Sequence, residues 1–115
     1  AGDVGAPIVN PSGAAAQVVG AVLDGVNQAV GQRILLENGR IQQRNFPDPS
    51  PLRMVEAVPV EFRLVRSSAA PTGLGEPALP PLAPALVNAL AGAFGRRFRT
   101  LPLRTAGLAL DPAPR

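Results

Sequence analysis

One carboxylate is a candidate for chemistry because the residues on both sides of it restrict the backbone. Glu76 follows Gly73 and Gly75 and precedes Pro77 in the run PTGLGEPALPPLAP. Gly75 allows the backbone to approach another group closely or to take a positive φ, and Pro77 biases Glu76 away from helical geometry. The sequence therefore predicts a carboxylate on a stiff loop. Local chemistry alone favours a simpler interpretation, a solvated acid that complements the dipole of a following helix.

The composition limits which other groups can take part in chemistry. The chain has no Cys and no His, so it offers no disulfide, no cysteine-ligated zinc or iron–sulfur cluster, and no histidine base. Any chemistry must use carboxylates, amides, arginines or a cofactor from outside the chain. The eleven basic residues are all arginines, scattered apart from the run GRRFR at 95–99, and aromatic residues are only 3% of the chain. This pattern argues against a nucleic-acid partner.

A long amphipathic helix is predicted in the first third of the chain. The apolar residues 4–9 are typical of a short strand. Asn10 can cap a helix whose first position is Pro11, and Ser12 is an equally good capping candidate. Over residues 14–30, apolar side chains recur at helical spacing, and Gly31 is expected to end the helix. The apolar positions are Val18, Val19, Val22, Leu23, Val26 and Val30.

A hairpin, a strand and a second helix complete the expected elements. Asn38 and Gly39 are a strong signal for a hairpin turn, because both central residues of a type I′ turn need positive φ. An irregular, proline-rich connection is expected next, over residues 45–59. Residues 58–66 alternate between apolar and polar side chains, as in a half-buried strand near a sheet edge. A closing apolar helix is expected over residues 82–94, with Gly95 after its end.

Three motifs together resemble the C-terminal end of the molybdenum-binding subunit of the xanthine dehydrogenase and aldehyde oxidase family, most closely its isoquinoline 1-oxidoreductase branch. They are the Asn-Pro turn IVNPSGAAAQ before a glutamine-bearing helix, the hairpin ILLENGRIQQRNF that leads into LRM, and GLGEPALPPLAPALVNAL followed by GRRFRTLPL. The Gly-Glu-Pro-x-x-Pro-Pro pattern is the most specific. The resemblance covers about residues 3–103, but Val19 and Ala21 stand where relatives commonly have Glu and Gly.

The resemblance implies roles for three residues and a reaction. Glu76 would be the active-site base, and Gln17 and Gly75 would bind the cofactor, with Gln17 at its pterin part; no residue is assigned to a metal. A solvated side chain is the alternative for Gln17. The implied reaction is oxidation of an aldehyde or an N-heteroaromatic substrate with water as the oxygen source. A carboxylate in a water-poor pocket suits the role of base at neutral pH.

Cofactors and partners are implied in the same way. The cofactor would be molybdopterin cytosine dinucleotide with molybdenum, and electrons would leave through [2Fe-2S] clusters in a partner chain. Further partners would be the remainder of the molybdenum-binding subunit and a cytochrome or another electron acceptor. The compartment stays open between bacterial periplasm and cytoplasm, and the substrate is not identified. No apolar run is long enough to span a membrane, and the N-terminus lacks the basic start of a signal peptide.

The fold class expected is α+β: a fragment of a larger molybdenum-binding domain with two main helices, a hairpin and short strands. Because family subunits are several times longer, residues 1–104 are expected to be the C-terminal portion of that domain, inactive alone, followed by a loosely held tail over residues 105–115. The alternative from another class is a small non-catalytic interaction module with PALPPLAPAL as a proline-rich recognition segment. Against it, these prolines run directly into an amphipathic helix.

Overall fold

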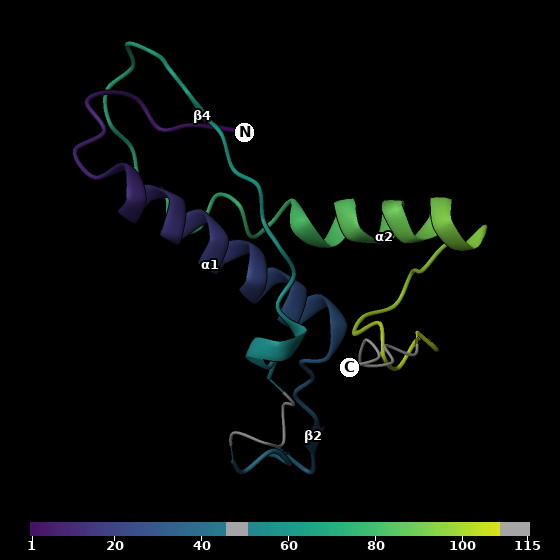
Figure 1. Ribbon diagram of the computed structural model, residues 1–115. Coiled ribbons are helices and arrows are strands. Elements are labelled where there is room, and N and C mark those ends of the chain that lie inside the picture. Colours follow the sequence, from purple (N-terminus) through teal and green to yellow (C-terminus); the bar gives the residue numbers. More distant parts are fainter. Residues whose placement is uncertain (46–50, 109–115) are drawn as a thin grey trace.

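Two helices packed against each other form the body of the protein (Figure 1). The computed structural model describes residues 1–45 and 51–108. The elements in chain order are β1 (Gly2–Asp3), α1 (Pro11–Val30), β2 (Leu36–Glu37), β3 (Arg40–Ile41), the short 3-10 helix η1 (Met54–Glu56), β4 (Leu64–Val65) and α2 (Leu82–Phe94). Two helices, a hairpin and short strands make this an α+β chain, as predicted.

The start of α1 is fixed by Asn10. Its Oδ1 accepts a hydrogen bond from the Gly13 amide at 2.9 Å and another from the Ser12 hydroxyl at 2.9 Å. Asn10 is therefore the cap, and Ser12 supports it. The helix begins at Pro11, as predicted for a cap at Asn10, three residues before the apolar periodicity over residues 14–30. Proline is well tolerated there because the first amide of a helix has no partner inside the helix.

Both helices end next to a glycine, as predicted, but only one of these glycines has a left-handed backbone conformation. Gly95, after α2, has a φ of 67°, which strongly favours glycine. Gly31, after α1, has a φ of −134° and donates its amide to Asn27 O at 3.0 Å. The predicted bounds of α2 match the observed ones.

The buried stripe of α1 consists mainly of small residues. The buried positions are Val18, Ala21, Gly25, Ala29 and Val30. The predicted apolar residues Val22, Leu23 and Val26 are only half-buried. At Gly25 the reason for a small residue is clear, because Leu82 at the start of α2 packs against it and leaves no room for a larger side chain.

A small core forms where the C-terminal end of α1 meets the segment after α2. Val30, Phe98, Leu103 and Leu108 are buried together. The amides of Leu103 and Arg104 donate to the carbonyls of Ala29 and Val30 at 2.8 and 3.0 Å, so two free carbonyls at the helix end are satisfied. Leu108 thus holds the first part of the expected tail to the core. Residues 109–115 lie outside the described residues, and the boundary at 104 stays a prediction.

The first strand is shorter than predicted and lies earlier in the chain. Instead of residues 4–9, only Gly2–Asp3 is a strand, because Gly5 has a φ of +76° that an extended strand cannot contain. Asp3 Oδ1 accepts hydrogen bonds from the Gly5 amide at 3.0 Å and from the Ser67 hydroxyl at 2.7 Å. These two bonds, the Gly5 amide first, hold the pKa of Asp3 below its ordinary value.

The predicted strand over residues 58–66 is likewise reduced to β4. It pairs in parallel with β1, with Gly2 opposite Leu64 and Asp3 opposite Val65. A strand ladder extends only as far as its partner, and β1 offers two residues. Of the predicted buried face, Phe62 and Leu64 are half-buried, whereas Val58 is exposed.

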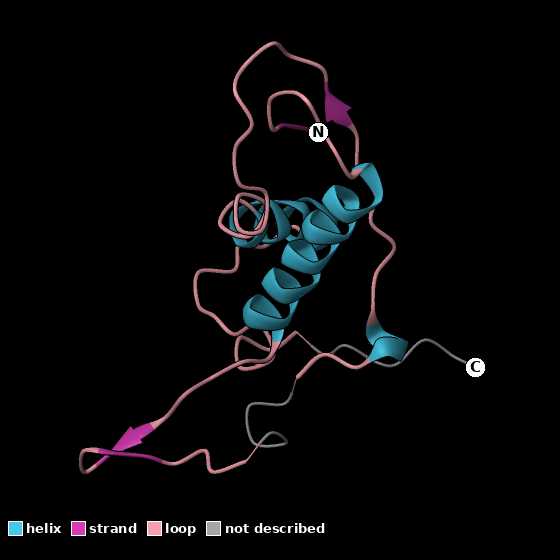
Figure 2. Cartoon of the chain, turned by 90° about the vertical axis from the view of Figure 1, so that its left-hand side faces the viewer, coloured by secondary structure: helices cyan, strands magenta, loops and turns pink. Residues whose placement is uncertain are grey.

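The β2–β3 hairpin is confirmed, and its turn has the predicted geometry. Asn38 has a φ of 49° and Gly39 a φ of 75°. Figure 2 shows the hairpin projecting away from both helices. Its apolar side chains Ile34, Leu36 and Ile41 are 61%, 69% and 57% exposed.

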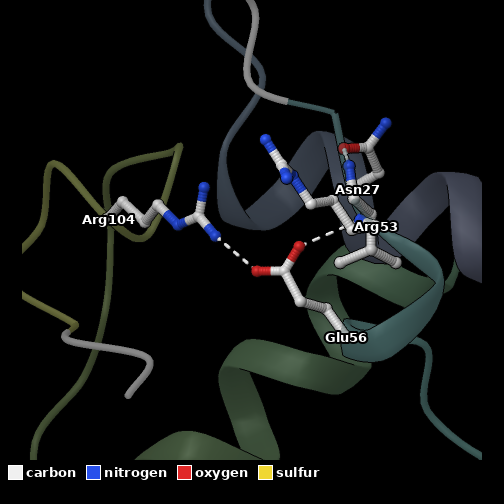
Figure 3. A network of polar contacts seen from close by, with 5 residues as sticks. Asn27, Arg53, Glu56 and Arg104 are labelled. Carbon is white, nitrogen blue, oxygen red and sulfur yellow. Dashed lines mark hydrogen bonds and ion pairs between the residues drawn. The ribbon is translucent and has the colours of Figure 1, made fainter. Parts of the chain in front are cut away.

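A polar network joins the irregular connection to α1 and to the segment after α2 (Figure 3). The Leu52 amide donates to Asn27 Oδ1 of α1 at 2.7 Å, and the Arg53 amide donates to Glu56 Oε2 at 2.9 Å. Glu56 Oε1 also lies 3.1 Å from Arg104 Nη2, so η1 is tied to the segment after α2. Residues 46–50 of the same predicted connection lie outside the described residues.

The described chain is more extended than a self-contained domain. Its radius of gyration is 16.8 Å, against about 13 Å for a compact domain of this length. Val9, Met54 and Val55 are 91%, 90% and 87% exposed. Among the residues described, neither helix combines the length and hydropathy that a membrane span requires. The exposed apolar side chains agree with the expectation of a fragment that packs against further protein.

Candidate functional site

The structure brings two of the three predicted site residues into contact. A Cβ atom built on Gly75 would lie 2.8 Å from Oε1 of Gln17. Among the described residues other than its two chain neighbours, only Cδ of the same side chain also lies within 4 Å of it. Gly75 is not among the glycines with positive φ. Of the two reasons that the sequence offered for a glycine here, close approach applies and positive φ does not. Gly73, by contrast, faces open space.

The Gly75 loop lies beside α1 because the residues before it are hydrogen-bonded to the N-terminal segment. The Thr72 amide donates to Val4 O at 3.0 Å, and the Ala6 amide donates to Ala69 O at 2.9 Å. The N-terminal segment then continues into the Asn10 cap. The same short stretch therefore anchors both the start of α1 and the chain that leads to Gly75.

Two consecutive turns connect Glu76 to the start of α2. The Leu79 amide donates to Glu76 O at 2.9 Å, and the Leu82 amide donates to Leu79 O at 3.2 Å. Prolines at 77, 80 and 81 fix φ along this segment. Figure 1 shows the green segment before α2 passing across α1. The predicted stiff loop is thus present, and it ends in the helix that was expected.

Gln17 and Glu76 both present exposed side chains. Within residues 1–45 and 51–108, no hydrogen bond is recorded for either side chain. An exposed amide offers one acceptor and two donors, and the bare backbone at Gly75 leaves the space that the Gln17 amide itself occupies. This donor set fits the polar ring system of a pterin cofactor, with a carboxylate on the next residue.

Nothing in the described chain encloses this site. A surface groove of about 490 Å³ lies between α1 and the start of α2 and is lined by Gln28, Arg33, Leu79 and Leu101 among others, but not by Gln17 or Glu76. The described residues also contain no group of three or more His, Cys, Asp or Glu side chains able to hold a metal ion. Any water-poor pocket around Glu76 would need walls from other protein.

Sequence reasoning missed the contact between Gly25 and Leu82. Glycine inside a helix costs about 1 kcal/mol relative to alanine, so an interior glycine points to a packing requirement. Gly20 lies in the same predicted helix, and nothing in the sequence distinguishes Gly25 from it. The partner of that glycine could not be read from the sequence.

Comparisons with known proteins agree on one family. The chain is 35% identical over 99 residues to the membrane-bound aldehyde dehydrogenase [pyrroloquinoline-quinone] of Gluconacetobacter polyoxogenes, covering 86% of this chain and 13% of that protein. It is 35% identical over 104 residues to the beta subunit of isoquinoline 1-oxidoreductase of Brevundimonas diminuta, covering 90% of this chain and 13% of that protein. A subunit of nicotinate dehydrogenase of Pseudomonas putida is 29% identical over 97 residues, 84% of this chain and 8% of that protein.

A solved structure supports the fold. The Cu,Mo-CO dehydrogenase in its carbon monoxide reduced state matches 81% of this chain and 12% of its own chain, with a TM-score of 0.63 and 24% identity. No protein-family profile matches the chain. The chain spans about one eighth of the length of the curated relatives at 35% identity. With its motifs, fold and relatives in agreement, the chain belongs to the xanthine dehydrogenase and aldehyde oxidase family.

Proposed function

We propose that the chain is part of a molybdenum hydroxylase, to which it supplies the glutamate base and two cofactor contacts. The observation that carries this proposal is the meeting of Gln17 with Gly75, one residue before Glu76. The two segments are more than fifty residues apart in the sequence, yet the Gln17 amide lies against the backbone of the residue before Glu76. Relatives named as aldehyde, isoquinoline and nicotinate oxidoreductases support an aldehyde or N-heteroaromatic substrate.

Each of the three residues has a role that follows from its chemistry. Gln17 would hold the pterin through hydrogen bonds from its amide, and Gly75, which has no side chain, would leave room for that amide and contact the cofactor through its backbone. A molybdopterin, in its cytosine dinucleotide form, would supply the two-electron redox chemistry. A carboxylate oxygen of Glu76 would take the proton from the water-derived oxygen as that oxygen attacks the substrate carbon.

The remaining parts of the enzyme would come from outside this chain. Glu76 is exposed here, so the rest of the molybdenum-binding subunit would close the pocket and exclude water. Two of the relatives are named as subunits, which supports an assembly of several chains. We propose a [2Fe-2S] partner and a cytochrome or another acceptor as the path for the electrons.

Replacing the carboxylate by its amide tests the proposal. Glu76→Gln keeps shape but cannot take a proton, so kcat of the complete enzyme is expected to fall by roughly 10² to 10⁴ while molybdenum content is retained. If Glu76 only complemented the helix dipole, its replacement would lower the free energy of unfolding by at most about 1 kcal/mol and would leave kcat unchanged. Glu61→Gln, at another exposed acid, is the matched control. Near-wild-type turnover of Glu76→Gln would refute the assigned base.

Metal analysis tests the proposed cofactor independently. One relative is named with pyrroloquinoline quinone, so the complete enzyme should be assayed for both molybdenum and quinone. Molybdenum close to one per subunit is expected, and quinone without molybdenum would refute the cofactor.

The alternative of a proline-rich recognition module loses support, because Pro80 and Pro81 lie in a turn and Pro84 lies in the first turn of α2.

A further inference from the structure

We infer that Gly25 is a positioning residue for Glu76, and this inference rests on the proposed function. A Cβ atom on Gly25 would lie 2.7 Å from Cδ2 of Leu82 and 3.2 Å from its Cβ. Leu82 is the first residue of α2. The absence of a side chain at Gly25 therefore sets how closely α2 can begin against α1.

The position of Leu82 is transmitted to Glu76 through the backbone. The Leu82 amide bonds to Leu79 O, and the Leu79 amide bonds to Glu76 O, so the segment from Glu76 to Leu82 forms two linked turns. Three prolines fix φ at three of the seven positions in this stretch. A displacement at Leu82 is consequently not absorbed by a flexible linker before it reaches the carboxylate.

Helix α1 contacts this arm, the segment from Gly75 to Leu82, at both ends. Gln17 lies against Gly75 at one end, and Gly25 lies against Leu82 at the other. Eight residues of helix correspond to about 12 Å along the axis, so one rigid element fixes both contacts. The helix thus acts as a template that holds the Glu76 loop at two points.

A methyl group at position 25 should move the arm. The nearest contact, 2.7 Å, is 0.7 Å shorter than the 3.4 Å of an ordinary contact. Rotation of the Leu82 side chain can relieve the contact with Cδ2, but Cβ of Leu82 is already at 3.2 Å and moves only with the backbone. A misplacement of about 1 Å in a catalytic group costs about 100-fold in rate. A shift of about 0.2 Å, from the Cβ contact, or about 0.7 Å, if Leu82 does not rotate, would thus correspond to a fall in kcat of roughly 2- to 25-fold.

The test compares Gly25→Ala with Gly92→Ala in the complete enzyme. Gly92, in α2, has no atom within 4 Å of an added Cβ and controls for the gain in helix propensity. Two readouts are needed: kcat and KM, and hydrogen exchange of the Leu79 and Leu82 amides, with the Leu103 amide as internal reference. In Gly25→Ala we expect kcat to fall with KM nearly unchanged, and exchange at Leu79 and Leu82 to rise relative to Leu103. Leu82→Ala in the same chain should restore part of both.

Three results would overturn the inference. Turnover and exchange in Gly25→Ala that match Gly92→Ala, while Glu76→Gln is inactive, would remove the positioning role and leave the proposed function intact. A uniform rise in exchange that includes Leu103, without rescue by Leu82→Ala, would show general destabilisation instead. Full turnover of Glu76→Gln would refute the proposed function and the inference with it.

Discussion

The contact between Gly75 and Gln17 allows the cofactor role to be tested apart from catalysis. In Gly75→Ala, the new Cβ would lie 2.8 Å from Gln17 Oε1, 0.6 Å closer than an ordinary contact of 3.4 Å. The obstructing atom is the end of a flexible, exposed side chain, so the amide should move and the backbone should not. The substitution is therefore expected to displace the proposed cofactor contact without unfolding the loop.

The size of the effect follows from one hydrogen bond. Losing a typical hydrogen bond costs about 0.5–1.5 kcal/mol, which corresponds to roughly 2- to 10-fold weaker retention of the cofactor. Stability should change little, because replacing glycine by alanine at a compatible φ stabilises by about 0.4–1 kcal/mol through the unfolded chain. Gly73→Ala, two residues away in open space, carries the same gain without the contact.

The assay measures molybdenum per subunit during dialysis, together with the melting temperature. Gly75→Ala should lose the metal faster than Gly73→Ala, and both should melt close to the wild type. Gln17→Ala should lose the metal at least as fast as Gly75→Ala, because it lacks the amide altogether. Equal retention in the two glycine-to-alanine variants would refute the reasoning, as would normal retention in Gln17→Ala.

Three further predictions concern stability. Because the pKa of Asp3 is lowered in the folded state, its contribution to stability is fully present above the ordinary value of 3.8 and is lost as pH falls through the lower folded value. Protection of the Gly5 amide from hydrogen exchange should fall over that pH range, and Asp3→Asn should remove this pH dependence. Glu56→Gln should cost less than about 1 kcal/mol, because the partly exposed ion pair with Arg104 is weak; a larger loss in denaturant titrations of the complete subunit would contradict this. Expressed alone, the 115 residues should aggregate or melt without cooperativity, and a monomer with one sharp calorimetric transition would count against a fragment.

The elements that the sequence predicted well are those set by neighbouring residues. The bounds of α2 and the Asn38–Gly39 turn depend on local signals, namely a left-handed glycine and two positive φ values. For the start of α1 the sequence offered two caps, Asn10 and Ser12, and the structure selects Asn10, with Pro11 as the first helical residue. Such signals act over a few residues and can be recognised in the sequence alone.

The elements that were predicted poorly depend on contacts across the chain. The length of β4 is set by the two residues that β1 offers it, and the strand pattern over residues 58–66 contains no information about that partner. Hydrophobic periodicity in α1 favoured its large side chains, whereas the buried stripe contains Ala21, Gly25 and Ala29, and α2 comes close at Gly25. For the site, the resemblance suggested Gln17 and Gly75 separately, and only the structure shows that they touch.

The parallel pairing of β1 with β4 has a thermodynamic consequence for the loop that follows it. Gly2 lies opposite Leu64, so this pairing closes a loop of about 60 residues, and the entropy of closing such a loop costs roughly 4 kcal/mol. Only two residues of ladder and a few neighbouring hydrogen bonds, including that of Thr72 to Val4, offset this cost. The segment before Glu76 should therefore be less stable than the two helices and open locally while both helices persist. A ligand that binds only the closed form would stabilise it by mass action, so the order of the loop would depend on what it binds.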